Sequence, residues 1–188
     1  MDYKIILASN SPRRRELLAG LGLDFEVKVI AGIDESYPDD MPVEKVAEYI
    51  ASQKAIPYYS TISSNELVIT ADTVVVCDHE IFGKPINKKD AYRMLRQLSG
   101  KTHHVITGVC LTSQKKQRIF SVTTEVSFKE LTDEEINYYI DNEHPMDKAG
   151  AYGIQEWIGY IGCIGLKGSY YNVMGLPVQR IYEELKKF

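Results

Sequence analysis

Three consecutive arginines follow a serine-rich turn near the start of the chain, in the sequence SNSPRRRELL of residues 9–18. The order Ser11-Pro12 predicts a helix that begins at the proline, because serine caps helices and proline favours the first helical position. A helix N-terminus already carries partial positive charge and unpaired N–H groups, so arginines there oppose the helix dipole. Such a turn suits a bound phosphate. Arginines that only face solvent would cost about 0.3–1 kcal/mol each and could also persist.

An aspartate interrupts a long β-branched run. Asp72 lies within residues 67–77, LVITADTVVVC, a composition typical of a central strand. A carboxylate buried without a partner is costly, so Asp72 requires a metal ion, a cation or the edge of the sheet. A strand ending at Ala71 would also accommodate it, but the apolar pattern resumes at Val74. Ligands of α/β sheets bind outside the carboxyl ends of strands, so Asp72 and the arginine turn could share one site.

Three further charged side chains are candidates for that site. Lys54 lies on the apolar stripe of a predicted helix, Lys84 stands in the turn sequence Gly83-Lys84-Pro85, and Glu35 belongs to an acidic loop. Both lysines could neutralise phosphate, or they could simply extend to solvent. Glu35 could join Asp72 around Mg²⁺, which takes one or two carboxylates together with water and substrate phosphates, although acidic loop residues are usually just solvated.

Residues 147–155, DKAGAYGIQ, combine charges with two glycines. This composition suits a loop whose backbone approaches a ligand, or equally a surface turn. Gln155 could pair with the edge of a base, because its amide offers both a donor and an acceptor. The later glycines do not form a dinucleotide fingerprint after a strand. The pair His103-His104 has no partner at metal-ligand spacing, so we expect it at the surface where a strand begins.

The elements that must position these residues follow from hydrophobic periodicity and turn signals. Strands and helices alternate at first and two adjacent strands follow, so the fold class expected is α/β with a mixed, partly antiparallel sheet flanked by helices. The predicted strands are residues 5–8, 25–30, 67–77, 105–111 and 119–128, and the predicted helices are 12–21, 42–55, 88–99, 133–142 and 177–187.

Composition limits the classes of protein. The 188 residues, 44% hydrophobic and 26% charged, predict a single globular domain over 1–188. The net charge of −4 provides no overall attraction for nucleic acid or an anionic membrane, and no apolar run approaches the about 18 residues of a membrane span. The three cysteines are odd in number and outside any C-x-x-C pair, which favours a reducing compartment. We therefore expect a soluble, cytoplasmic protein.

Six separated motifs follow one another along the chain: residues 9–18, Ala71-Asp72-Thr73, Gly83-Lys84-Pro85, Thr107-Gly108-Val109, residues 147–155 and residues 168–177. In the order and spacing of these motifs, the chain resembles the Maf (septum formation inhibitor-like) nucleoside triphosphate pyrophosphatases over essentially its whole length.

The resemblance implies hydrolysis of a nucleoside triphosphate to its monophosphate and pyrophosphate, with a divalent cation. It also implies a single Maf-type domain with a Maf/ITPase-like fold, a central cleft and a homodimer. By position in the motifs, Asp72 corresponds to the proton acceptor, whereas Arg13, Thr73 and Gln155 correspond to residues that set base specificity. The arginine opening and the segment AYGIQ resemble the branch that acts on dTTP and UTP.

The residues support the same chemistry. Arg14, Lys54 and Lys84 would neutralise the charges of a triphosphate, and Ser9 and Ser11 would contact phosphate at the helix start. Mg²⁺ or Mn²⁺, held by Asp72 and Glu35, would act at the reacting phosphorus, and Asp72 could either activate water or mainly hold the metal. Two alternatives are a non-enzymatic nucleotide-sensing regulator of cell division and the same reaction on another nucleotide, such as 7-methyl-GTP.

Overall fold

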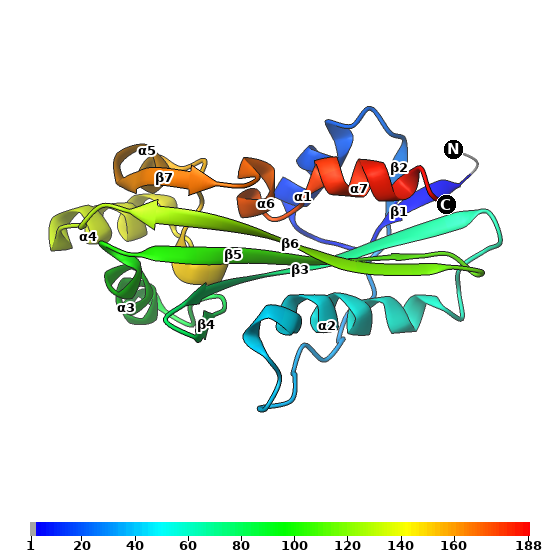
Figure 1. Ribbon diagram of the computed structural model, residues 1–188, viewed down its shortest axis with the longest axis horizontal. Helices are drawn as coiled ribbons and strands as arrows, with labels where there is room; N and C mark the ends of the chain where they lie inside the picture. The colour runs from blue at the N-terminus through cyan, green and yellow to red at the C-terminus, as the bar shows by residue number, and fades with distance from the viewer. Residues whose placement is uncertain (1–2) are drawn as a thin grey trace. The chain divides into compact units, whose positions relative to one another are not determined.

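The computed structural model describes residues 3–188, which form a mixed α/β fold with a seven-stranded sheet (Figure 1). The strand order is β2-β1-β3-β5-β6-β7, with β4 paired to β3. The strands are β1 Lys4–Leu7, β2 Phe25–Val27, β3 Glu66–Cys77, β4 Glu80–Phe82, β5 Thr102–Thr112, β6 Gln117–Phe128 and β7 Cys163–Lys167. The helices are α1 Pro12–Ala19, α2 Val43–Ala55, α3 Lys88–Leu98, α4 Asp133–Glu143, α5 Trp157–Gly162, α6 Tyr170–Met174 and α7 Val178–Leu185, with short 3₁₀ turns at Ile56–Tyr58 and Ala149–Ala151. None of the helices in the described chain is long and apolar enough to cross a membrane.

The predicted fold class and every predicted helix and strand are confirmed, with differences at their ends. Strand β2 is shorter than predicted, whereas β5 and β6 begin earlier than predicted. The prediction missed β4, α5, β7 and α6. These elements have three to six residues each, too few for a period of 2 or 3.6 to become visible in a sequence.

The chain divides into two compact units. Unit 1 contains the chain up to residue 72 together with residues 107–122 and 175–188, and unit 2 contains residues 73–106 and 123–174. The long strands β3, β5 and β6 contribute residues to both units (Figure 1).

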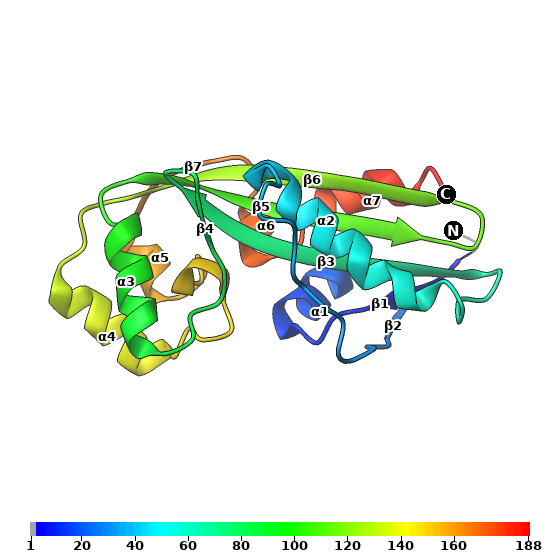
Figure 2. The same ribbon diagram turned by 90° about the horizontal axis from the view of Figure 1, so that it is seen from below.

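In unit 1, β1 pairs in parallel with β2 and with the first half of β3, and the register places Ile5 opposite Leu67. Helix α2 lies against the unit 1 parts of β3 and β5 (Figure 2). The approach is close because Gly108 of β5 has no side chain, and a Cβ there would lie 2.2 Å from the backbone of Ala47. The hydroxyl of Thr70 in β3 also donates to the Ala51 carbonyl, at 2.7 Å.

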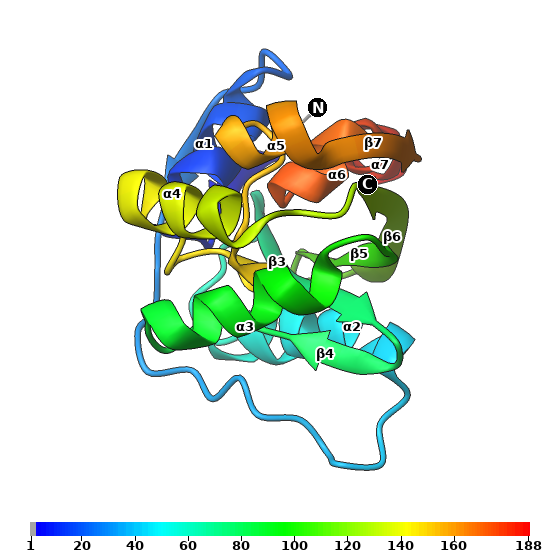
Figure 3. The same ribbon diagram turned by 90° about the vertical axis from the view of Figure 1, so that its left-hand side faces the viewer.

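Unit 2 has its own apolar core under α3 and α4. Helix α3 packs against α4 (Figure 3), and its residues Ala91, Leu95 and Leu98 are completely buried. Leu131 and Tyr139 are buried in the same cluster. Both helices begin as the sequence predicted, since the Asn87 side chain caps α3 and a full capping box begins α4 at Thr132.

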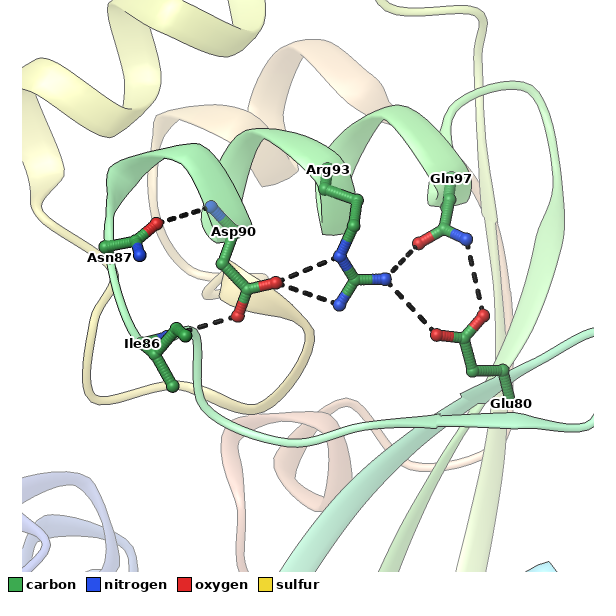
Figure 4. A network of polar contacts seen from close by, with 6 residues as sticks. All are labelled: Glu80, Ile86, Asn87, Asp90, Arg93 and Gln97. Atoms are coloured by element: carbon green, nitrogen blue, oxygen red, sulfur yellow. Dashed lines mark hydrogen bonds and ion pairs between the residues drawn. The ribbon is translucent and has the colours of Figure 1, made fainter.

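A polar network attaches α3 to β4 on the surface of unit 2 (Figure 4). Arg93 donates to Asp90 within the helix and to Glu80 of β4, at 3.0 and 3.2 Å. Gln97 completes the network by bonding both Arg93 and Glu80. Because the side chains of Arg93 and Glu80 are about half exposed, their ion pair contributes little stability and mainly defines how β4 lies beside the helix.

The predicted surface position of His103 is wrong. His103 is completely buried in unit 2, where its Nε2 and the Tyr152 hydroxyl lie 2.7 Å apart. Its ring also packs edge-on against Phe128 and Tyr152, with centroids 5.0 and 5.4 Å away. The alternating burial of β5 directs residue 103 inward, because the strand begins at Thr102, earlier than the sequence indicated. Burial lowers the pKa of His103 to about 3.

This histidine makes the stability of the protein dependent on pH. An unfolded histidine binds a proton near pH 6.5, whereas buried His103 resists protonation down to about pH 3, so the unfolded state holds more protons in that window. We expect the free energy of unfolding to fall by about 1.4 kcal/mol for each pH unit below 6.5. Urea denaturation between pH 7.5 and 5 measures this slope, which His103→Gln should reduce and His104→Gln, at an exposed neighbour, should retain. Equal slopes in all three proteins would contradict the assignment.

Candidate active site

Two carboxylates and one ammonium group meet in unit 1. Lys54 Nζ lies 2.7 Å from Asp72 Oδ1 and 2.9 Å from Glu35 Oε1. The side chains of Lys54 and Asp72 are only 15% and 14% exposed, whereas that of Glu35 is 54% exposed. The ammonium group therefore compensates the carboxylate that interrupts β3, and the alternative that Lys54 only extends to solvent is wrong.

Each member of this cluster is positioned by a different element. Asp72 lies within β3, and the strand continues beyond it to Cys77, so the alternative of a strand ending at Ala71 is also wrong. Lys54 lies in the last turn of α2, the helix that packs closely over Gly108. Glu35 comes from the irregular segment between β2 and α2, and its contact with Lys54 brings that segment to the cluster.

The serine turn before α1 has the predicted form. Ser11 is the N-cap, and its hydroxyl accepts from the Arg14 backbone N–H at 3.4 Å. Ser9 is buried, and its hydroxyl accepts from the Ser11 backbone N–H at 3.2 Å. Arg13 is half-buried in the first turn of the same helix. The helix contains no acidic residue in its first turn to offset these positive charges.

The Arg14 side chain points into the protein. Its Nε donates to the Gly175 carbonyl and its Nη1 to the Ala71 carbonyl, each at 2.8 Å. Burial lowers the pKa of Arg14, and the neighbouring charges of Asp72 and Glu35 oppose that shift. Arg14 thus connects α1 to the backbone directly before Asp72.

The remaining predicted residues belong to unit 2. Thr73 follows Asp72 in β3 and is half-buried, whereas Lys84 is exposed after β4. The Gly150 N–H donates to the Gly83 carbonyl at 3.1 Å, which places the turn of Lys84 beside the segment that leads to Gln155. Gln155 Oε1 is buried, and none of the described residues donates a hydrogen bond to it. A buried acceptor without a donor is rare in proteins and indicates a missing partner.

A buried polar network that the sequence did not reveal holds this segment of unit 2. Tyr139 accepts from the Gly153 N–H at 3.0 Å and donates to Glu156, whose other oxygen pairs with Lys148 at 2.9 Å. Burial, reinforced by Glu156, raises the pKa of Tyr139, so this hydroxyl stays a donor at neutral pH. The composition of residues 147–155 predicted either a loop that approaches a ligand or a surface turn. The alternative of a surface turn is wrong, because residues 150–154 are buried, and only the fold brings α4 to the segment.

The unit 1 cluster has donors that fit a hard divalent cation. Two carboxylates, Asp72 and Glu35, each have an oxygen within 3 Å of one nitrogen, and Mg²⁺ commonly takes one or two carboxylates in addition to substrate phosphates. Within residues 3–188 no three acidic, histidine or cysteine side chains form a complete metal cage. The two carboxylates therefore fit an ion whose remaining ligands come from water and from the phosphates of a substrate.

Comparison with known proteins supports the family resemblance that the sequence motifs indicated. A family model described as Maf-like protein matches residues 4–188. A dTTP/UTP pyrophosphatase of Phocaeicola vulgatus is 63% identical over 98% of this chain and 96% of its own length. Proteins of the same name from Parabacteroides distasonis and Porphyromonas gingivalis are 58% and 53% identical over 99% of the chain and 96% and 94% of their own lengths. A solved structure of a HAM1 protein from Coxiella burnetii is 14% identical over 99% of this chain and 100% of that one, with a TM-score of 0.47. Since the family model covers nearly every residue, the chain belongs to the Maf-like protein family.

Proposed function

We propose that this protein is a nucleoside triphosphate pyrophosphatase that hydrolyses dTTP and UTP to the monophosphate and pyrophosphate. The observation that carries the proposal is the cluster of Asp72, Lys54 and Glu35 beside the capped start of α1. A carboxylate, an ammonium group and a capped helix N-terminus lie in the same unit, and a helix N-terminus is suited to binding phosphate, which supports the proposal. The names of relatives at 53 to 63% identity support the substrate.

In this reaction a water molecule attacks the α-phosphorus, the anhydride bond between the α- and β-phosphates breaks, and pyrophosphate leaves. Asp72 accepts the proton of the attacking water. Lys54, together with Lys84, neutralises phosphate charge, and the turn of Ser9 and Ser11 offers two hydroxyl donors. A divalent cation, Mg²⁺ or Mn²⁺, would be held by Asp72 and Glu35 and would supply Lewis-acid polarisation of the phosphate.

Base recognition belongs to Arg13, Thr73 and Gln155 in this proposal. Gln155 carries the strongest support, because its Oε1 is a buried acceptor without a donor among the described residues. The N3–H group of thymine or uracil is a suitable donor for it, and the amide nitrogen of Gln155 can donate in return to a base carbonyl. A ring with the opposite donor and acceptor pattern would leave these groups unpaired.

The test is release of pyrophosphate by the purified protein from a panel of common and modified nucleoside triphosphates, with Mg²⁺, with Mn²⁺ and with a chelator. Strong release from dTTP and UTP that the chelator abolishes is the expected result. Release confined to another nucleotide, such as 7-methyl-GTP, would keep the reaction and overturn the substrate. Tight nucleotide binding without any release would favour the alternative of a non-enzymatic regulator.

The variant Gln155→Glu tests base recognition. A carboxylate cannot donate a hydrogen bond and adds negative charge, so we expect kcat/KM for dTTP and UTP to fall by about 10²-fold or more, with a melting temperature close to that of the wild type. The matched control is Gln179→Glu, because Gln179 is exposed on α7. An unchanged nucleotide preference in Gln155→Glu would remove this residue from base recognition.

We also propose a cytoplasmic homodimer that does not bind nucleic acid. The three cysteines are thiols, which suits a reducing compartment, and the net charge of −4 disfavours nucleic acid. Tyr160 and Ile164 of unit 2 are 80% and 70% exposed, as expected for apolar side chains that contact a second copy. Sedimentation of the purified protein tests the dimer, and a monomer at micromolar concentration would contradict it.

A further inference from the structure

Arg14 completes a hydrogen-bonding pattern that the sheet leaves unfinished. In the parallel pair β1 and β3, the Ala8 N–H donates to the Ile69 carbonyl at 2.9 Å. The next carbonyl of β3 that points to the same side belongs to Ala71, because carbonyl directions alternate along a strand. By then β1 has ended at Leu7 and the chain has entered the serine turn before α1, and the guanidinium of Arg14 donates to the Ala71 carbonyl.

The same guanidinium also holds the chain before the last helix. Arg14 Nε donates to the Gly175 carbonyl, while Nη1 donates to Ala71, both at 2.8 Å. The planar group thus spans two backbone segments, and each bond gains strength because the donor is charged. Gly175 has a φ of 115°, a conformation that favours glycine, and it directly precedes Leu176, which is completely buried.

Both acceptors are main-chain atoms, and one of them belongs to the peptide unit that joins Ala71 to Asp72. Movement of that carbonyl would rotate the peptide plane and shift the Asp72 carboxylate away from Lys54. A displacement of about 1 Å at a reacting group can cost 10²-fold in rate. Two of the N–H donors of Arg14 are thus directed at backbone carbonyls of the protein.

We propose that Arg14 is a positioning residue that holds Asp72 through the Ala71 carbonyl, and that it is not a ligand of the triphosphate. The proposal rests on the proposed function and changes the role that the sequence predicts for Arg14. In this proposal Lys54 and Lys84 neutralise the charge of the triphosphate, and the serine turn contacts its phosphates.

The experiment compares Arg14→Lys and Arg14→Gln with the matched control Arg15→Gln, which removes an exposed charge from the same helix. Steady-state kinetics on dTTP give kcat and KM, and hydrogen exchange of peptides covering residues 69–73 and 174–177 reports on the two backbone segments without requiring turnover. Arg14→Lys keeps the charge but lacks the planar fork that reaches both carbonyls. If Arg14→Gln fails to fold, Arg14→Lys alone tests the proposal.

We expect kcat to fall about 10²-fold in Arg14→Lys, KM to stay within about threefold of the wild type, and both peptides to exchange faster, with Arg15→Gln unchanged. A tenfold or larger rise in KM with unchanged exchange would overturn the proposal, because it would make Arg14 a substrate ligand. If the wild-type protein released no pyrophosphate, the proposed function would fail. The positioning role would then be decided by exchange alone, supported by faster exchange in Arg14→Lys and overturned by unchanged exchange.

Discussion

Replacing Asp72 with asparagine is expected to lower kcat for pyrophosphate release from dTTP by about 10³-fold or more, since removing a general base costs about 10²–10⁴-fold. The amide is the same size as the carboxylate and its oxygen can still accept from Lys54, which also keeps Glu35 as a partner. It cannot accept a proton and is a poorer ligand for a divalent cation. The melting temperature should therefore change by only a few degrees while turnover is lost.

The measurement is single-turnover and steady-state pyrophosphate release, together with calorimetric binding of dTTP and a thermal melt. The matched control is Asp78→Asn, which neutralises an aspartate whose side chain is 71% exposed just after β3. That control should retain the wild-type rate. Full turnover by Asp72→Asn would exclude Asp72 from the chemistry, whereas loss of turnover together with loss of the folded state would assign it a structural role.

Adding a single methyl group at Gly108 is expected to destabilise the protein strongly. An alanine Cβ there would lie 2.2 Å from Ala47 backbone atoms and 2.4 Å from the Glu48 nitrogen. Backbone atoms cannot rotate away as a flexible side chain can, so α2 must move off the sheet. We expect Gly108→Ala to cost roughly 2–4 kcal/mol, the upper range for overpacked cores, and to lower the melting temperature by roughly 5–15 °C.

The same change should also lower activity, because α2 carries Lys54. Urea denaturation and dTTP turnover measure the two effects. The control Gly165→Ala adds the same methyl group in β7, where the nearest neighbouring atom would lie 3.6 Å away, so its stability should stay within about 0.5 kcal/mol of the wild type. A stable and fully active Gly108→Ala protein would show that α2 can shift without affecting the site.

The predictions for Asp72 and Gly108 are linked through Lys54 on α2. Lys54 forms an ion pair with Asp72, and the helix that carries Lys54 lies directly on the sheet, where Gly108 leaves room for it. The close approach of α2 therefore explains why the motif Thr107-Gly108-Val109 contains a glycine, which the composition of the motif did not reveal. It contributes no reacting group. Its glycine allows α2, which carries Lys54, to lie close to β5, the strand next to β3, which carries Asp72.

The local structure around the candidate site residues could be predicted from the sequence, because its signals are local. The serine cap of α1, the capping box of α4 and the β-branched run around Asp72 each depend on residues within a few positions of one another. The family motifs likewise identify the chemistry by residue type and order. The sequence by itself thus determined the fold class, most helices and strands, and the family.

Only the tertiary structure decided which partners these residues have. Lys54 and Asp72 are 18 positions apart, and Arg14 is 57 and 161 positions from Ala71 and Gly175. Periodicity carries no information about pairing over such separations, because it reports which face of an element is buried and not what covers it. Lysine and arginine can extend to solvent or turn inward at similar local cost, and the carbonyls and carboxylates that packing presents to them determine which occurs. His103 is a further example. Strand β5 begins three residues earlier than the sequence predicted, so His103 lies within the strand and its side chain is buried in the core and not at the surface.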